Sequence, residues 1–148
     1  MELCVKTFDE LTADELYDLL ALRTAVFVVE QQYPYQDADG LDRQALHVWL
    51  RDENGIRAYL RVMDRGVSGE EVRIVRVIAV ERRQGLGSRV LAAGIKAAKE
   101  RFRAEAIAVE AQVYAKGLYE KQGFRTVSEE FLEDGIPHVK MVLTIRNP

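Results

Sequence analysis

Val72-Arg-Ile-Val-Arg-Val-Ile-Ala-Val80 and Glu81-Arg82-Arg83-Gln84-Gly85-Leu86-Gly87-Ser88 follow one another directly in this chain. The first segment is apolar and rich in β-branched residues, which predicts a strand. The second is a short basic turn with two glycines, after which an amphipathic pattern predicts a long helix. The first N–H groups of a helix lack intrahelical partners, and the helix dipole favours negative charge there. The sequence therefore predicts a phosphate site at this turn.

The turn also limits which phosphate ligand it can take. Glycine lets the backbone approach an anion closely, and Arg82 and Arg83 supply forked donors that suit phosphate. The Gly-Lys-Ser/Thr ending of a P-loop is absent, and so is the third glycine of a dinucleotide fingerprint. A nucleoside triphosphate and a dinucleotide are therefore both disfavoured. The alternative interpretation is an ordinary strand-to-helix turn with exposed arginines.

Two motifs together resemble those of a known superfamily. Arg82-x-x-Gly85-x-Gly87 after a strand resembles the coenzyme A pyrophosphate loop of the GNAT superfamily of N-acetyltransferases. The segment Gln112-Val-Tyr-Ala115-Lys-Gly-Leu-Tyr119-Glu-Lys-Gln-Gly123-Phe124 resembles the family's Asn or Gln at a strand end, followed by a small residue and Leu-Tyr-x-x-x-Gly-Phe. Two motifs in the expected order and spacing are far more specific than either alone.

Further segments resemble one branch of that superfamily, the ElaA-type acetyltransferases. Leu22-Arg23-Thr-Ala-Val26-Phe27-Val-Val-Glu30-Gln31 is similar to their N-terminal half, and Asp134-Gly135-Ile136-Pro137-His138-Val139 to their C-terminal segment. The resemblance spans nearly the whole chain. It implies an α/β (α+β) domain with the GNAT fold, in which a mixed, mostly antiparallel sheet is splayed between two central strands and flanked by helices.

Composition and length agree with one domain over residues 1–148. A formal net charge of −3 argues against a nucleic-acid binder, and no apolar run is long enough to cross a membrane. There is one cysteine and nothing that resembles a signal peptide, so we expect a cytoplasmic protein. The acids Asp37, Asp39 and Asp42 lack the spacing of a calcium loop, and we expect no metal.

Local patterns predict the order of the elements. Thr12 and Glu15 form a capping box that opens the first helix. A meander of three antiparallel strands follows, with a hairpin turn at Glu53-Asn54-Gly55. We expect strands at 2–8, 45–51, 56–64, 72–80, 106–111, 124–127 and 138–145, and later helices at 87–103 and 113–122.

The resemblance implies acetyl-CoA as the acetyl donor, with its pantetheine paired to the strand that ends at Val80. The backbone N–H of Ile78 would polarise the thioester carbonyl. Because the stretch before Gly85 is about two or three residues shorter than is usual in the family, Val77 is the alternative donor. The implied cofactor-binding residues are Ile78, Ala79, Val80, Arg82, Arg83, Gln84, Gly85, Leu86, Gly87, Ser88, Gln112 and Tyr119.

The resemblance also implies catalytic roles. Tyr119 would protonate the departing coenzyme A thiolate. Glu30, Glu110 and His138 are candidates for removing the proton of the amine, and His138 can equally be structural. Arg23, Phe27, Glu30 and His138 would bind the acceptor. The alternative for Arg23 and Glu30, which lie seven residues apart, is a structural ion pair.

We therefore expect an N-acetyltransferase that moves the acetyl group to a primary amine by direct attack in a ternary complex. The acceptor, a small molecule or a peptide, is not readable from the sequence. The main alternative is a non-catalytic coenzyme A-binding or sensor domain on the same fold. A third is an interaction module that dimerises through its last strands. Homodimers are common in the wider family, so a homodimer is expected only by analogy.

Overall fold

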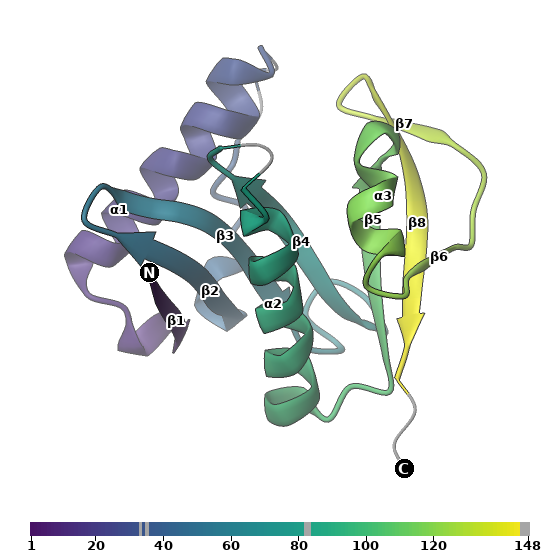
Figure 1. Ribbon diagram of the computed structural model, residues 1–148, viewed down its shortest axis with the longest axis horizontal. Coiled ribbons are helices and arrows are strands. Elements are labelled where there is room, and N and C mark those ends of the chain that lie inside the picture. The colour runs from purple at the N-terminus through teal and green to yellow at the C-terminus, as the bar shows by residue number, and fades with distance from the viewer. Residues whose placement is uncertain (33, 35, 82–83, 146–148) are drawn as a thin grey trace.

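The computed structural model describes residues 1–32, 34, 36–81 and 84–145. One sheet dominates, with strands in the order β1-β2-β3-β4-β5-β8-β6 and β7 paired to β8 (Figure 1). The strands are β1 (Glu2–Thr7), β2 (Ala45–Asp52), β3 (Gly55–Met63), β4 (Val72–Ala79), β5 (Ala106–Gln112), β6 (Arg125–Thr126), β7 (Phe131–Glu133) and β8 (Ile136–Thr144). The α-helices are α1 (Ala13–Thr24), α2 (Leu86–Phe102) and α3 (Lys116–Glu120).

The sheet opens between its two central strands. Strands β1 to β4 form an antiparallel meander, and β5, β8 and β6 form a second antiparallel group. The two groups meet where β4 runs parallel to β5, and this pairing is restricted to Val72 with Ile107 and Arg73 with Ala108. Beyond Arg73 the two strands diverge (Figure 1). The expected splay between β4 and β5 is therefore present.

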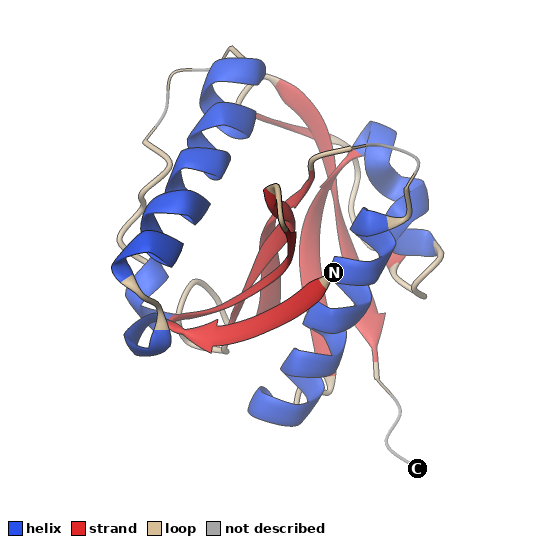
Figure 2. Cartoon of the chain, turned by 60° about the vertical axis from the view of Figure 1, so that its left-hand side comes forward, coloured by secondary structure: helices blue, strands red, loops and turns tan. Residues whose placement is uncertain are grey.

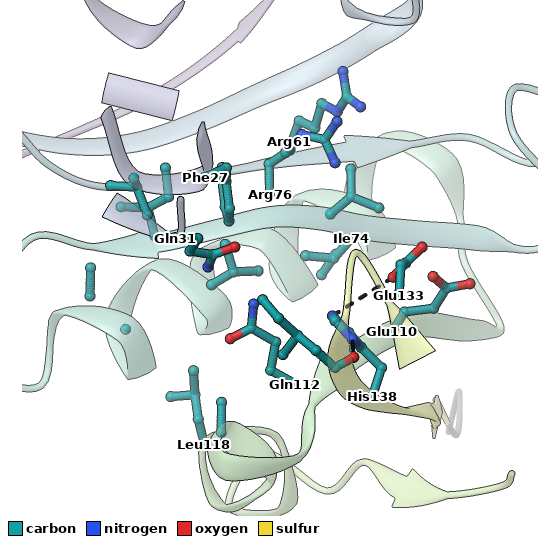
Figure 3. Close-up of a pocket in the computed structure, with 18 of the residues that line it drawn as sticks. Phe27, Gln31, Arg61, Ile74, Arg76, Glu110, Gln112, Leu118, Glu133 and His138 are labelled. Atoms are coloured by element: carbon teal, nitrogen blue, oxygen red, sulfur yellow. Dashed lines mark hydrogen bonds and ion pairs between the residues drawn. The ribbon is translucent and has the colours of Figure 1, made fainter. Parts of the chain in front are cut away.

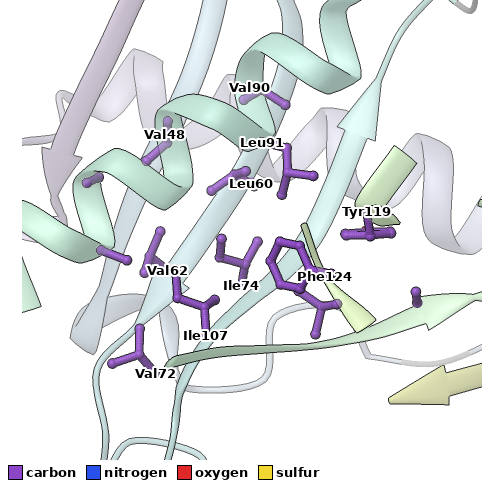
Figure 4. Packing of buried hydrophobic residues seen from close by; sticks show 14 of the residues in the cluster. Val48, Leu60, Val62, Val72, Ile74, Val90, Leu91, Ile107, Tyr119 and Phe124 are labelled. Atoms are coloured by element: carbon purple, nitrogen blue, oxygen red, sulfur yellow. The ribbon is translucent and has the colours of Figure 1, made fainter. Parts of the chain in front are cut away.

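Helices cover both faces of the sheet, because the strand residues are apolar on both sides. On one face Val90 and Leu91 of α2 pack with Leu60, Ile74 and other buried strand residues (Figure 4). On the other face Leu19 of α1 packs against Trp49, Tyr59 and Ile78. Figure 2 shows these helices on opposite sides of the strands. Both layers thus hold β4 from the two sides and fix the edge of the splay.

The local predictions hold for most elements, with shifts of one or two residues at their ends. The capping box of α1 is present, since the Glu15 N–H donates to the Thr12 hydroxyl at 3.1 Å and the Glu15 carboxylate accepts from the Thr12 N–H at 2.9 Å. Helix α1 continues beyond Thr24 as a π-helix, η2 (Ala25–Glu30). This wider turn changes the residues that face the sheet.

Two features differ from the sequence-based expectation. Strand β7 was not expected, although Asp134-Gly135 between apolar segments is a hairpin signal. The predicted helix 113–122 is a short 3₁₀ turn, η4 (Val113–Ala115), followed by α3. Further 3₁₀ turns are η1 (Phe8–Glu10) and η3 (Asp42–Gln44). Among the described residues no helix combines the length and apolarity needed to span a bilayer.

Candidate active site

A cavity of about 1290 Å³ fills the splay between β4 and β5 (Figure 3). It brings together segments that are far apart in the chain: η2, β3, β4, the start of α2, β5, α3 and the β7–β8 hairpin. The sequence-predicted residues that line it are Phe27, Glu30, Ile78, Ala79, Val80, Gly87, Glu110, Gln112, Tyr119 and His138. Both predicted halves of the site therefore meet in one cavity.

Other predicted residues lie elsewhere. Arg82 and Arg83 lie outside the described residues. Gln84 and Gly85 directly precede α2, and Leu86 and Ser88 lie in its first turn, but none of the four lines the cavity. The Leu86 side chain is buried in the core, so any contact with a cofactor would come from its main chain. Arg23 is fully buried and is also absent from the lining, which differs from its expected role in acceptor binding.

The turn before α2 has the backbone that the glycine pattern predicts. Gly85 has φ of +71°, a left-handed conformation that favours glycine, and it precedes the first residue of the helix. Gly87 lies between Ala79 of β4 and Leu118 of α3, and a Cβ placed there would come within 3.5 Å of the Leu118 methyl groups. This turn therefore brings the N-terminus of α2 to the end of β4, at the edge of the cavity.

Strand β4 contains a β-bulge at the centre of the cavity. Tyr59 of β3 pairs with Ile78, but Arg61 pairs with Val75, so Leu60 alone lies opposite Arg76 and Val77. Arg76 has φ of +59°, which is uncommon for a residue with a side chain. Bulges redirect side chains and backbone groups at functional sites.

The ladder fixes which N–H groups of β4 point into the splay. The Val80 N–H donates to the Arg57 carbonyl at 2.9 Å. In an antiparallel ladder hydrogen-bonded pairs alternate with non-bonded ones, so Tyr59–Ile78 is also a bonded pair. The N–H of Ile78 therefore points to β3, contrary to the role expected for it. By the same alternation the N–H groups of Val77 and Ala79 point away from β3, into the splay.

Tyr119 of α3 reaches the cavity from the core. Its ring packs edge-on against Phe124 with a centroid separation of 5.8 Å, and the residue is 7% exposed (Figure 4). No described residue forms a hydrogen bond with its hydroxyl. Burial raises the pKa of Tyr119 above its usual value. The phenol therefore stays protonated at neutral pH and can act only as a proton donor.

His138 and Glu133 lie together at the other side of the cavity (Figure 3). The Nδ1 atom of His138 is 2.7 Å from the Ile136 carbonyl oxygen. Since a carbonyl only accepts, Nδ1 carries the hydrogen and the neutral ring has its lone pair on Nε2. That Nε2 lies 3.7 Å from the Glu133 carboxylate. The arrangement fits a base whose ring orientation is fixed by the β7–β8 hairpin.

Glu110 completes this acidic side of the cavity. It forms an ion pair with Arg73 at 3.0 Å, so strand β4 holds the carboxylate of β5 across the splay. Partial burial and a hydrogen bond with Glu110 raise the pKa of Glu133. Gln112 is paired with His138 across β5 and β8 and lies beside it in Figure 3.

A network of three arginines and three aspartates, here called the Arg–Asp network, lies beside the cavity, and Asp39, Arg61 and Arg76 of this network line it. Arg23 donates from Nη1 to Asp42 at 2.6 Å, and its Nε lies 2.9 Å from Asp37. Arg61 donates to Asp42 at 2.7 Å and also binds Asp39. The remaining member, Arg76, donates from Nε to Asp37 at 3.1 Å. The expected partner of Arg23 was Glu30, but its partners are Asp37 and Asp42.

The Arg–Asp network explains the acids of the loop without a metal. Burial opposes ionisation of Asp39, but hydrogen bonds from Arg61 and from the Leu41 N–H outweigh it and lower its pKa to about 2. Burial likewise opposes ionisation of Asp42, and Arg23 and Arg61 lower its pKa on balance. The described residues contain no cluster of His, Cys, Asp and Glu suited to a metal ion.

His47 also belongs to this buried region. Its Nδ1 is 2.7 Å from the Tyr59 hydroxyl, and its Nε2 is 3.0 Å from the Asp42 carbonyl. Burial lowers the pKa of His47, which therefore remains neutral near pH 7. It links the loop before β2 to β3.

Sequence reasoning missed several residues of the cavity. Arg73 and Arg76 were treated only as strand residues, and the place of Glu133 beside His138 was not anticipated. The bulge has no sequence signal here, because Arg76 is not a glycine. The Asp134-Gly135 turn could have placed Glu133 beside His138, since a two-residue hairpin fixes the pairing of its strands.

Comparison with known proteins agrees with this geometry. Residues 9–145 match the family described as Acetyltransferase (GNAT) domain. A UPF0039 protein of Schizosaccharomyces pombe is 38% identical over 149 residues, covering 98% of each chain. The protein ElaA of Escherichia coli is 38% identical over 138 residues, covering 89% of each chain.

Solved structures give the same result. An acyl-CoA N-acyltransferase from Pseudomonas aeruginosa is similar with a TM-score of 0.90 and 36% identity, covering 97% of this chain and 100% of the other. E. coli ElaA gives a TM-score of 0.89 at 34% identity, covering 97% and 99%. The fold is shared as well with an aminoglycoside 6′-N-acetyltransferase solved with coenzyme A, at a TM-score of 0.71 and 16% identity.

Proposed function

Because this chain belongs to the GNAT family of acetyltransferases and is of the ElaA type, we propose that it transfers an acetyl group from acetyl-CoA to a primary amine. The amine attacks the thioester directly while both substrates are bound. Acetyl-CoA would occupy the splay, with its pyrophosphate at the N-terminus of α2 and its pantetheine beside β4. The acceptor would enter between η2 and the β7–β8 hairpin.

The polarising group in this proposal is the N–H of Val77. Val77 belongs to the bulge and directly precedes Ile78, and ladder alternation directs its N–H into the splay, whereas the N–H of Ile78 is directed to Tyr59. A donor there would stabilise the oxyanion that forms when the amine nitrogen attacks the carbonyl carbon. The main chain of Ala79 would pair with pantetheine as an added strand would.

His138 is the proposed base. An amine in neutral water is mostly an ammonium ion, which has no lone pair with which to attack. Nε2 of His138 would take the ammonium proton, directly or through a water, because Nδ1 is already committed to the Ile136 carbonyl. Glu133 beside Nε2 would stabilise the imidazolium that results.

Tyr119 is the proposed acid. When the tetrahedral intermediate collapses, the C–S bond breaks and the coenzyme A thiolate takes the phenolic proton. An ordinary thiol has a pKa of about 8.5, below that of a phenol, so this transfer would be uphill in water. A thiolate buried in the same cavity would be desolvated too, which raises its proton affinity. The imidazolium of His138 and the phenolate would then return to their starting states by exchange with solvent.

The observation that carries the proposal is that Tyr119 and His138, a proton donor and a proton acceptor, line one cavity in the splay. A non-catalytic coenzyme A-binding domain would need the cavity but not this pair. Acids on the acceptor side, Glu30, Glu133 and Asp134, favour a cationic acceptor over an anionic one.

The test begins with calorimetric titration of acetyl-CoA into the protein. Release of free thiol is then measured with panels of diamines, amino acids and short peptides. We expect micromolar acetyl-CoA binding, and thiol release that requires an amine. Binding without thiol release across all three panels would favour the non-catalytic alternative. The absence of acetyl-CoA binding would overturn the proposal.

A further inference from the structure

Arg76 has an unusual conformation at the centre of the cavity. Its φ of +59° falls in the left-handed region, which is unfavourable for a residue with a Cβ. Such a conformation persists only where the surrounding structure enforces it. Glycine would adopt it without that cost. The arginine side chain at this position therefore calls for a reason other than backbone preference.

The side chain of Arg76 reaches across to η2 and the loop that follows it, here called the acceptor wall because the acceptor is proposed to enter beside η2. Its Nε donates to Asp37 Oδ1 at 3.1 Å, and its Nη2 lies 3.6 Å from Asp39. Its guanidinium carbon lies 5.8 Å from the centroid of the Phe27 ring (Figure 3). Arg76, Phe27 and Asp39 all line the cavity. One side chain thus joins the bulge of β4 to η2 and to the loop that follows it.

The anchor for Arg76 is itself firmly held. The side chain of Asp37 is 5% exposed, and its second oxygen lies 2.9 Å from Nε of the fully buried Arg23. A buried carboxylate between two guanidinium groups cannot turn away without leaving a buried charge unpaired. The Arg76 guanidinium is therefore held by a buried carboxylate that is itself held by Arg23.

We propose that Arg76 is a positioning residue, which holds the β4 bulge so that the adjacent Val77 N–H meets the thioester carbonyl. Asp37 of the acceptor-side loop supplies the anchor. The acceptor wall and the carbonyl-polarising group are then fixed by one ion pair. This inference rests on the proposed function, because it requires acetyl-CoA in the splay.

The experiment uses acetyl-CoA labelled with ¹³C at the thioester carbonyl as the probe, and records the carbonyl stretching band of the bound ligand by difference infrared spectroscopy. A hydrogen bond to the carbonyl lowers the stretching frequency. This readout needs no knowledge of the acceptor, and a general loss of stability does not produce it. Affinity for acetyl-CoA is measured in parallel by calorimetry.

Four variants separate the contribution of the Arg76 ion pair from that of backbone strain at this position. Arg76→Gly removes the anchor but relieves the left-handed backbone, so it should be less destabilised than Arg76→Ala. Arg76→Ala removes the anchor and keeps the strain, and Arg76→Lys keeps a charge but loses the fork. Arg51→Ala changes an arginine of β2 that lies outside the cavity and serves as the control.

We expect the bound carbonyl band to be lowered in the unchanged protein and in Arg51→Ala. In Arg76→Gly and Arg76→Ala most of that lowering should be lost, while the Kd for acetyl-CoA changes by less than about threefold, because one carbonyl contact contributes little to the binding of a large ligand. Arg76→Lys should be intermediate. An equal lowering in Arg76→Gly and the unchanged protein would overturn the role of Arg76.

Two further outcomes count against the inference in different ways. If acetyl-CoA binds the unchanged protein without any lowering of the band, Val77 polarises no carbonyl and the inference fails, while cofactor binding stands. If acetyl-CoA does not bind at all, the proposed function fails first and the inference fails with it.

Discussion

His138 and Ile136 are joined by a contact of 2.7 Å between the imidazole Nδ1 and the backbone carbonyl oxygen two residues earlier in β8. This contact sets the tautomer, because the carbonyl can only accept a hydrogen. It leaves Nε2 as the basic atom on the cavity side, near Glu133. The turn of the β7–β8 hairpin thus decides which nitrogen of His138 is available for chemistry.

We predict that His138→Asn slows acetyl transfer about 100-fold at neutral pH, the usual order for loss of a general base. The asparagine amide can replace Nδ1 as donor to Ile136, so the fold should persist. The measurement is the rate of thiol release with the best amine of the screen. A His138→Asn protein as active as the unchanged protein would remove His138 from the role of base.

Glu133→Gln tests whether Glu133 supports His138. The Glu133 carboxylate lies 3.7 Å from Nε2, and a negative charge there favours the imidazolium that forms when His138 takes the proton. Glu133→Gln keeps the shape of the side chain and removes that charge, so the rate of thiol release should fall by less than in His138→Asn. A larger loss in Glu133→Gln than in His138→Asn would assign the role of base to Glu133.

Tyr119→Phe should lower kcat by about 100-fold while leaving the affinity for acetyl-CoA nearly unchanged, since the ring keeps its packing and only the proton donor is lost. Tyr17→Phe, on the exposed side of α1, is the matched control and should have no effect. Steady-state kinetics and calorimetry give the two quantities. A fully active Tyr119→Phe protein would exclude the phenol as the acid.

Gly87→Glu should weaken acetyl-CoA binding by at least about 100-fold, because it puts a carboxylate where the N-terminus of α2 is expected to meet the pyrophosphate. The new side chain would also meet Leu118. Ala92→Glu adds the same charge to an exposed position of the same helix and should bind normally. Calorimetric titration decides between them, and retained affinity in Gly87→Glu would contradict the assignment of this turn.

Gly94→Ala should destabilise the protein, although alanine favours helices. A Cβ at Gly94 would lie 2.8 Å from the Leu60 methyl groups, at the contact between α2 and β3. Overpacking of this kind costs about 1–3 kcal/mol, against roughly 1 kcal/mol gained in helix propensity. Urea unfolding measures the difference. Ala92→Gly, at an exposed site of α2, should lose about 1 kcal/mol from propensity alone.

The Arg–Asp network predicts how stability depends on pH. The pKa of Asp39 is about 2 and that of Asp42 is also lowered, both against the opposing effect of burial. A carboxyl group whose pKa is lower in the folded state contributes stability above its unfolded value, near 3.9, and loses it as the pH falls toward the folded value. The melting temperature should therefore fall between about pH 4 and pH 2. A melting temperature constant over this interval would contradict the ion pairs.

Much of the fold follows from local patterns in the sequence. The β-branched run of β4, the amphipathic spacing of α2 and the Thr12–Glu15 capping box each depend on neighbouring residues, so they could be predicted without tertiary structure. The phosphate site at the turn before α2 also followed from local residues, whereas the splay came from resemblance, because pairing between distant strands leaves no local signal.

The finer features of the site depend on long-range packing. The alternating pattern of the β4 sequence could not identify which N–H enters the splay, because the bulge at Arg76 shifts the register. The bulge could not be predicted either, because its left-handed residue is an arginine and not a glycine. The partners of Arg23 could not be predicted either. Asp37 and Asp42 lie in the segment between η2 and β2, and helical spacing indicated Glu30 instead.

The Arg–Asp network also bears on how such a chain can change over generations. Its six members carry equal numbers of positive and negative charges, and each arginine contacts at least one aspartate. Replacing one member strands a charge in the interior, which costs several kcal/mol, whereas replacing an ion pair by apolar residues of similar volume can be neutral. Single substitutions within the Arg–Asp network are therefore unfavourable. Related proteins should keep all six residues or exchange them in compensating pairs.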